Sequence, residues 1–240
     1  MPHGINRAMV LAAGLGTRMR PLTERIPKPL VPIAGQPMIG HALEHLREVG
    51  IADVVVNVSH LKDPLIQYLK NYPGLRCIIS EEDEPLETGG GLRHALHHLG
   101  DQPVYVINSD ILWIDRGEPA LNRLARYWDG ERMDWLFLVQ PRSRAPGYDR
   151  GEDHLFVTPE NTIGWEPEEA PYIIASVYVM HPRVLTGVAP GKFSAKVLWR
   201  KAMEERRLWC LPHLGLWCQA GSIPDLARAE ELLASFGKKA

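Results

Sequence analysis

The chain has 240 residues, of which 45% are apolar and 23% charged, and its formal net charge at pH 7 is −2. This length suffices for a buried core, and the slight negative charge argues against a nucleic-acid or membrane partner. No run of 18 apolar residues occurs, so we expect no transmembrane helix. Three cysteines without metal-ligand spacing are typical of reduced, buried thiols, and Met1–Arg7 lacks an apolar leader, which together predict a cytoplasmic protein.

Strands and helices are expected to alternate along the first half of the chain. Apolar runs predict strands, and apolar residues at helical spacing predict helices. The expected strands cover residues 9–13, 53–58, 75–80 and 103–108, and the expected helices cover 37–49, 89–99 and a segment that begins at Asp63. This alternation predicts an α/β fold with a doubly wound, mostly parallel, Rossmann-like sheet that is buried on both faces.

The second half of the chain has a less regular pattern. The expected helices lie near residues 118–128, 193–207 and 224–236, and the expected strands at 135–140, 154–158, 162–165 and 172–180. We see no repeat and no low-complexity linker. We therefore expect a single domain over residues 1–240, with a nucleotide-binding half (1–115) and a substrate-binding half (116–240) that contains a small mixed β portion.

The segment between the first strand and the first helix is the most informative part of the sequence. Residues 14–35 form a long loop rich in glycine, proline and charge, and long loops in compact domains are usually functional. Gly14 and Gly16 let backbone N–H groups approach a polyphosphate, while Arg18 and Lys28 offer two cations to phosphate oxygens. The spacing fits neither the dinucleotide fingerprint nor the P-loop. We predict a phosphate cradle of another kind.

Residues 11–30 closely resemble the opening motif of the nucleoside-diphosphate-sugar pyrophosphorylases, which are sugar nucleotidyltransferases with a glycosyltransferase-A-like fold. The resemblance continues at Glu87–Gly91, Asn108–Asp110, Phe193–Met203 and Gly215–Ser222, so it covers nearly the whole chain. The short length and the Glu-Thr-Gly-Gly-Gly run look most like the N-acetylmuramate-1-phosphate uridylyltransferases of cell-wall recycling. Mannose-1-phosphate guanylyltransferases and glucose-1-phosphate thymidylyltransferases are more distant in this resemblance.

The resemblance implies roles for individual residues. The implied nucleotide-binding residues are Leu11, Ala12, Ala13, Gly14, Gly16, Thr17, Glu87, Thr88 and Gly89. It places Arg18 at the triphosphate and Lys28 between the α-phosphate and the incoming sugar phosphate. Glu166 and Ser176 are implied to contact the sugar, where this sequence departs from the family pattern: no lysine follows Glu166, and Ser176 stands where glycine is usual. We expect an altered sugar pocket.

Asp110 follows the fourth expected strand at its carboxyl end, where ligands of open α/β sheets bind. A carboxylate there can hold Mg²⁺ against phosphates, because Mg²⁺ takes few protein ligands and keeps several waters. The family usually has a second metal-binding aspartate near the C-terminus, and Gln219 occupies that position here. We expect a Mg²⁺ site made of Asp110 and Gln219, with Asp225 as an alternative second acid.

Together these features predict an enzyme that transfers a nucleotide from an NTP to a sugar 1-phosphate and releases pyrophosphate. Arg18, Lys28 and Asp110 are the expected catalytic residues, and UTP with N-acetylmuramate 1-phosphate is the preferred substrate pair. One alternative is an enzyme like mannose-1-phosphate guanylyltransferase or phosphocholine cytidylyltransferase. The other is a catalytically impaired nucleotide-sugar-binding regulatory protein. We expect a monomer or a homodimer.

Overall fold

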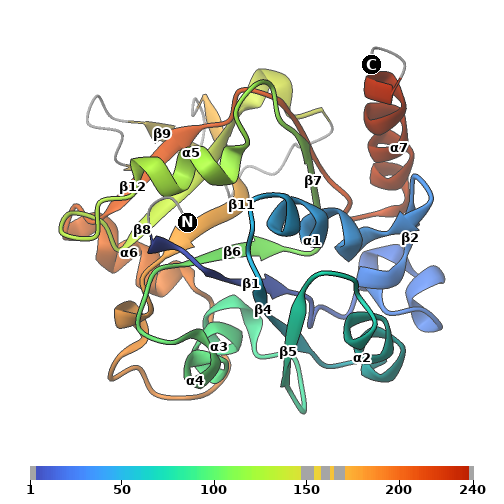
Figure 1. Cartoon of the computed structure of the whole chain (residues 1–240), viewed down its shortest axis with the longest axis horizontal. Coiled ribbons are helices and arrows are strands. Elements are labelled where there is room, and N and C mark those ends of the chain that lie inside the picture. The colour runs from blue at the N-terminus through green and yellow to red at the C-terminus, as the bar shows by residue number, and fades with distance from the viewer. Residues whose placement is uncertain (1–3, 147–153, 158–162, 165–170, 238–240) are drawn as a thin grey trace.

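The computed structural model of the chain describes residues 4–146, 154–157, 163–164 and 171–237 (Figure 1). Within these residues the main sheet has nine strands, and seven of them run in the order β10-β9-β11-β6-β1-β4-β5, while β8 pairs with β11 and β12. The bounds are β1 (Arg7–Leu11), β4 (Asp53–Val58), β5 (Arg76–Glu81), β6 (Val104–Asn108), β8 (Trp135–Pro141), β9 (His154–Val157), β10 (Ile163–Gly164), β11 (Tyr172–Met180) and β12 (Leu208–Pro212).

The central strands β6, β1, β4 and β5 are parallel, and helices cover both of their faces. Successive residues of β1 alternate between two apolar cores: Ala8 and Val10 belong to one, and Met9 to the other. The first core is closed by α1 (Met38–Glu48), α2 (Lys62–Lys70) and α5 (Ala120–Tyr127), and the second by α3 (Glu87–His94), α4 (Leu96–Leu99) and α6 (Lys196–Glu204). In Figure 1, α1 and α5 lie on one side of β1 and β6, and α3 and α4 on the other. The predicted doubly wound α/β sheet is confirmed.

Two small sheets and one helix complete the frame around the carboxyl edge of the main sheet. One small sheet joins β7 (Ile111–Ile114) to β13 (Leu216–Gln219), and the other joins β2 (Pro32–Ile33) to β3 (Gln36–Pro37). The last helix, α7 (Ile223–Gly237), stands at the edge of the molecule beside β2 and follows β13 (Figure 1). The sequence pattern did not predict these short strands, nor β12.

Tertiary contacts explain two of the differences between the expected and the observed boundaries. The strand expected at residues 9–13 ends at Leu11, because the Ala12 N–H donates to the Asn57 side chain and leaves the strand ladder. The helix expected at 193–207 begins only at Lys196, because the Phe193 carbonyl accepts a hydrogen bond from the Gly90 N–H of another helix. The helix expected at 89–99 is divided into α3 and α4.

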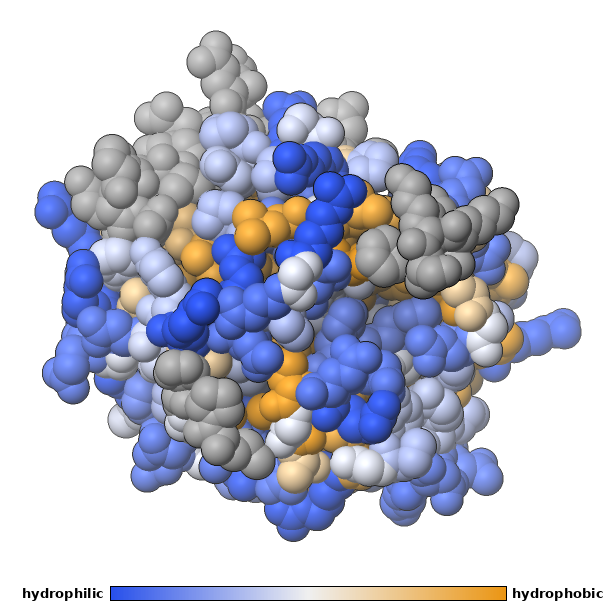
Figure 2. Space-filling model, turned by 45° about the horizontal axis from the view of Figure 1, so that its top comes forward, coloured by the Kyte–Doolittle hydropathy of each residue, from blue (hydrophilic) through white to orange (hydrophobic). Residues whose placement is uncertain are grey.

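The molecular surface is mainly hydrophilic on the face shown in Figure 2, where apolar atoms appear in narrow strips between charged and polar side chains. In the part of the chain that the structure describes, no helix combines the length and the apolar character needed to cross a bilayer.

The three cysteines are free thiols. Cys210 and Cys218 are buried and Cys77 is half-buried. Burial raises the pKa of the Cys77 thiol to about 11 and that of Cys210 and Cys218 to about 12. A thiol whose pKa lies well above the solvent pH is almost entirely protonated, and the protonated form is not the nucleophile.

We therefore expect the cysteines of the native protein to react slowly with iodoacetamide at pH 8. Intact-mass spectrometry measures the number of labels that each molecule takes up. Protein unfolded in guanidinium chloride should take up a label at each of the three cysteines quickly, because its thiols return to a pKa of about 8.5. Rapid labelling of the native protein at any of these cysteines would contradict this burial.

Candidate active site

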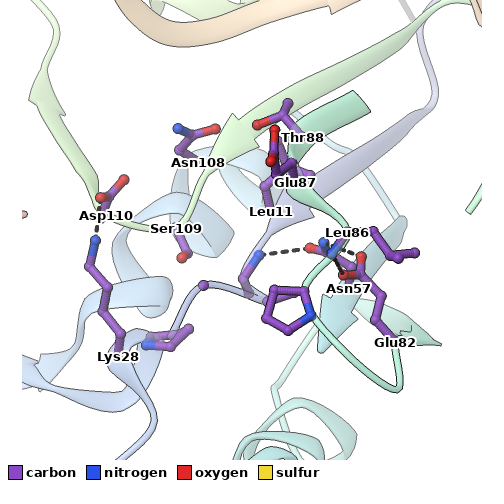
Figure 3. Close-up of a pocket in the computed structure, with 15 residues that line it drawn as sticks. Leu11, Lys28, Asn57, Glu82, Leu86, Glu87, Thr88, Asn108, Ser109 and Asp110 are labelled. Carbon is purple, nitrogen blue, oxygen red and sulfur yellow. Dashed lines mark hydrogen bonds and ion pairs between the residues drawn. The ribbon is translucent and has the colours of Figure 1, made fainter. Parts of the chain in front are cut away.

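A cavity of about 200 Å³ lies at the carboxyl ends of the parallel strands (Figure 3). Its walls come from the segment after β1, the Lys28 turn, the segment between β5 and α3, and the end of β6. The lining residues are Leu11, Ala12, Ala13, Gly14, Lys28, Pro29, Asn57, Glu82, Pro85, Leu86, Glu87, Thr88, Asn108, Ser109 and Asp110. This edge of an open α/β sheet is where such folds bind their ligands.

The turn after β1 forms the floor of the cavity. Ala12 and Ala13 are buried, whereas Gly14 is exposed and a Cβ built on it would meet no atom within 4 Å. Gly16 has a different reason for being glycine. Its φ is +65°, and a Cβ there would come within 2.8 Å of Thr23. Gly14 therefore borders open space, while Gly16 packs closely against Thr23 of the same loop.

Arg18 lies outside the set of residues that line this cavity, next to the C-terminal segment. A Cβ added to Gly221 would stand 3.1 Å from an Arg18 guanidinium nitrogen, so the guanidinium rests against the backbone there. Gly221 follows β13 and precedes α7. Thr17 is exposed beside Arg18 and likewise does not line the cavity.

Lys28 and Asp110 form an ion pair at the rim of the cavity, with side chains 12% and 11% exposed (Figure 3). Lys28 lies between Pro27 and Pro29 and begins a 3-10 turn (Lys28–Leu30), and Asp110 lies in the short connection between β6 and β7. Partial burial strengthens this attraction relative to an exposed pair. The pair ties the loop after β1 to the end of β6.

Gln219 completes this group from the other end of the chain. Its side-chain amide nitrogen lies 3.4 Å from the Asp110 carboxylate, at the oxygen that also meets Lys28. The pairing of β13 with β7 sets Gln219 opposite Ile111, and the Ala220 N–H donates to the Asp110 carbonyl at 2.8 Å. The structure thus brings together the two residues expected to bind Mg²⁺.

Asp225, considered as an alternative acid, is engaged elsewhere. Its carboxylate accepts from the Ser222 hydroxyl at 2.6 Å and pairs with Arg228 at 2.6 Å, both within the start of α7. Among the residues that the structure describes, no three histidine, cysteine, aspartate or glutamate side chains form a group that could hold a metal ion.

The N-terminus of α3 forms the wall of the cavity opposite the Lys28–Asp110 pair (Figure 3). Glu87 and Thr88 line the cavity, and Glu87 has a φ of +62°, a left-handed conformation that costs a non-glycine residue about 1–2 kcal/mol. Such strain often marks a ligand site. Gly89 does not line the cavity; a Cβ on it would overlap the Phe193 ring. Close packing against Phe193 therefore explains why residue 89 is a glycine.

The backbone of Ser176 is strained within β11. Its φ is +55°, and the register of β11 against β8 shifts between Ile174 and Tyr178. The neighbouring Ala175 carbonyl accepts from the Trp217 indole N–H at 3.0 Å. Ser176 lies outside the cavity described above. Glu166, the other residue expected to contact the sugar, is outside the described residues.

Several cavity residues were not identified from the sequence, notably Asn57, Glu82, Leu86 and Ser109. Asn57 carried a signal, because it is a polar residue inside the apolar run of β4 and is only 3% exposed. Glu82 and Ser109 follow the ends of β5 and β6, where polar residues of parallel sheets meet. Leu86 carried no signal of its own.

The fold and this site define an α/β protein whose cavity, bordered by a largely buried lysine–carboxylate pair, suits a phosphorylated ligand. The chain belongs to the family of proteins with a MobA-like NTP transferase domain, whose family model matches residues 8–217. This match and the relatives below confirm the predicted sugar nucleotidyltransferase family.

Two curated relatives match the chain along nearly its whole length. The N-acetylmuramate alpha-1-phosphate uridylyltransferase of Caulobacter vibrioides is 37% identical, covering 95% of this chain and 96% of that protein. The enzyme of the same name from Neisseria meningitidis serogroup B is 32% identical, covering 96% of this chain and 99% of that protein. A probable mannose-1-phosphate guanylyltransferase of Oryza sativa subsp. japonica is 40% identical, covering 98% of this chain and 66% of that protein.

Solved structures confirm the fold. The inositol-1-phosphate CTP transferase from T. maritima superposes with a TM-score of 0.79 at 20% identity, covering 98% of this chain and 97% of that one. UDP-glucose pyrophosphorylase from Acinetobacter baumanii also has a TM-score of 0.79, at 17% identity, with 98% of each chain covered. These proteins share the nucleotidyltransferase fold predicted from the sequence.

The contact between α3 and residues 191–193 gives a test of the glycine run. A Cβ on Gly90 would overlap the Gly191 carbonyl oxygen and come within 2.9 Å of Leu86 Cβ. We expect Gly90→Ala to lower the free energy of unfolding by about 1–3 kcal/mol, the usual cost of overpacking a tight contact. This expected loss is the net value, after alanine's higher helix propensity has contributed about 1 kcal/mol in the opposite direction.

Gly14→Ala is the matched control, because its added Cβ enters open space. Urea unfolding followed by circular dichroism measures both variants. A Gly90→Ala protein as stable as the wild type would show that α3 and residues 191–193 do not pack this closely in solution.

Proposed function

We propose that the chain transfers a nucleoside monophosphate from an NTP to a sugar 1-phosphate, with UTP and N-acetylmuramate 1-phosphate as its preferred substrates. The observation that carries this proposal is the largely buried Lys28–Asp110 pair at the rim of a cavity bounded by the phosphate loop. The substrate choice is supported by the names of two relatives that match nearly the whole chain. A cytoplasmic location and a monomeric or homodimeric state stay predictions.

The proposed division of labour follows the two halves of the chain. Among the residues that the structure describes, those that line the cavity all lie between Leu11 and Asp110, within the half (1–115) expected to bind the nucleotide. Gln219 and Ser176 come from the other half (116–240), which we propose to bind the sugar phosphate. Because the Lys28–Asp110 pair lies beside Gln219, it stands at the boundary between the two halves.

The chain's residues have separate roles in this reaction. An oxygen of the sugar 1-phosphate attacks the α-phosphorus of the NTP, the bond from that phosphorus to the β-phosphate oxygen breaks, and pyrophosphate leaves. Lys28 neutralises charge on the reacting phosphates, since a fixed cation stabilises charge that develops in the transition state. Arg18 stabilises the departing pyrophosphate from its position against Gly221. The phosphate nucleophile is already ionised, so no residue need act as a strong base.

The donor set at the rim fits a divalent cation. Asp110 supplies a carboxylate and Gln219 a neutral amide in the same group, and both are hard donors of the kind that Mg²⁺ accepts. Mg²⁺ is commonly held by one or two carboxylates together with substrate phosphates. When bound, it would join the two substrates and offset the negative charge of their phosphates.

Gln219 also favours a second candidate function. An uncharged side chain beside Asp110 leaves one protein carboxylate at the rim, which weakens the hold on a cation. A chain that binds a nucleotide sugar but turns over slowly would act as a sensor or regulatory partner. Pyrophosphate release separates the two functions.

The first test is pyrophosphate release by the purified protein with Mg²⁺, a set of NTPs and a set of sugar 1-phosphates. We expect release with UTP and N-acetylmuramate 1-phosphate, and a loss of at least about 100-fold in kcat for Lys28→Met. Lys62→Met is the control, because it removes only a surface ion pair with Glu81. Nucleotide binding without release from any pair of substrates would favour the sensor.

Restoring a second carboxylate should change how the protein responds to Mg²⁺. In Gln219→Asp, two carboxylates face each other, so the variant should melt at a lower temperature than the wild type in the absence of Mg²⁺. Mg²⁺ should raise its melting temperature by more than it raises that of the wild type, with roughly tenfold tighter binding.

Thermal unfolding across a Mg²⁺ titration, with ionic strength held constant by NaCl, measures this difference. Equal shifts for both proteins would show that position 219 does not contribute to cation binding.

A further inference from the structure

A continuous line of hydrogen bonds crosses the carboxyl ends of β1, β4 and β5 and forms part of the cavity wall (Figure 3). Its two side chains, Asn57 and Glu82, are each only 3% exposed. Asn57 belongs to β4, and Glu82 directly follows β5. Neither residue belongs to the lysine–aspartate group at the rim.

The direction of each bond in this line is fixed by the backbone groups at its two ends. The Ala12 N–H donates to Asn57 Oδ1 at 2.7 Å, and the Leu86 N–H donates to Glu82 Oε2 at 3.0 Å. Both ends therefore require an acceptor. Between them, Asn57 Nδ2 donates to Glu82 Oε1 at 2.7 Å. An amide followed by a carboxylate satisfies this order of donors and acceptors.

The line joins the floor of the cavity to its wall. Ala12 belongs to the floor, and Leu86 precedes Glu87 and Thr88, which line the wall at the start of α3. Helix α3 rests directly on the two side chains. A Cβ on Gly91 would come within 2.8 Å of Glu82 Oε1 and 2.9 Å of Asn57 Nδ2. The spacing between floor and wall therefore depends on these bonds.

Packing alone does not explain why a carboxylate is buried at position 82. Burying a carboxylate without a cation costs several kcal/mol unless its oxygens accept good hydrogen bonds. In the described part of the chain, the hydrogen bonds to its carboxylate come from a side-chain amide and a backbone N–H, both neutral. An apolar pair would fill the same space but would leave the Ala12 and Leu86 N–H groups unpaired.

We propose that Asn57 and Glu82 are positioning residues that set the width of the nucleotide cavity and hold Thr88 and the strained backbone of Glu87 in place. They act through the Ala12 and Leu86 backbone, away from the reacting atoms. The proposal rests on the proposed function, because it concerns the same cavity.

Exchanging the two chemical groups provides the test. In Glu82→Gln, the new amide can satisfy only one of the two donors that the carboxylate accepts from. In Asn57→Asp, two carboxylates face each other at the centre of the line. In the double variant, the carboxylate now at position 57 accepts from both the Ala12 N–H and the amide now at position 82. The carbonyl oxygen of that amide accepts from the Leu86 N–H. The double variant restores every bond and keeps the net charge.

The measurement is the Kd for UTP by isothermal titration calorimetry without an acceptor, together with KM and kcat for UTP and the melting temperature. We expect each single variant to weaken UTP binding about tenfold, as for the loss of one or two buried hydrogen bonds. Each single variant should raise the KM for UTP by a larger factor than it lowers kcat. The double variant should bind within about threefold of the wild type.

Asp134→Asn is the matched control, because it makes the same carboxylate-to-amide change at a buried site, where Arg183 and Arg207 are the partners. It should lower the melting temperature and leave the Kd for UTP unchanged. UTP binding by the single variants equal to the wild type, whatever their melting temperatures, would overturn the positioning role. A double variant no better than Glu82→Gln would also overturn it. No UTP binding by the wild type would overturn the proposed function as well.

Discussion

Coverage of the parallel sheet on both faces is the constraint on which the rest of this structure depends. Because α1, α2 and α5 pack on one face and α3, α4 and α6 on the other, the central strands have little room for polar side chains. Polar groups gather instead where the strands end, and that edge becomes the cavity. Within β4, Asn57 is a polar side chain that is nevertheless buried, and its hydrogen bonds to Ala12 and Glu82 account for it.

The sequence predicted the parts of the fold that depend on local pattern. Strands β4 and β11 have the expected bounds, because each is a mostly apolar run, rich in β-branched residues, with clear ends. Strands β7, β12 and β13 were missed, since each is short and is defined by a partner strand distant in sequence. The sequence of a short apolar run does not specify which strand it will pair with.

The candidate site could be predicted where a residue stands out in the sequence by its own chemical type. Lys28, Asp110 and Gln219 were identified individually, and the structure brings all three into one group. The glycines of α3 could not be interpreted in the same way. Gly89 and Gly90 are small because residues 191–193 pack on them, and Gly91 because Glu82 and Asn57 lie beneath it. These contacts depend on the tertiary fold, which the sequence around residue 90 does not contain.

The placement of β11 between β6 and β8 has a consequence for synthesis on the ribosome. Strand β6 is complete by Asn108, yet the neighbour that covers its outer edge is Tyr172–Met180. Until that later segment has been translated, the emerging chain presents an unpaired apolar strand, the kind of edge that recruits another chain. The nascent protein thus passes through an interval in which the edge of β6 is open to pairing with another chain, and that interval ends when β11 docks.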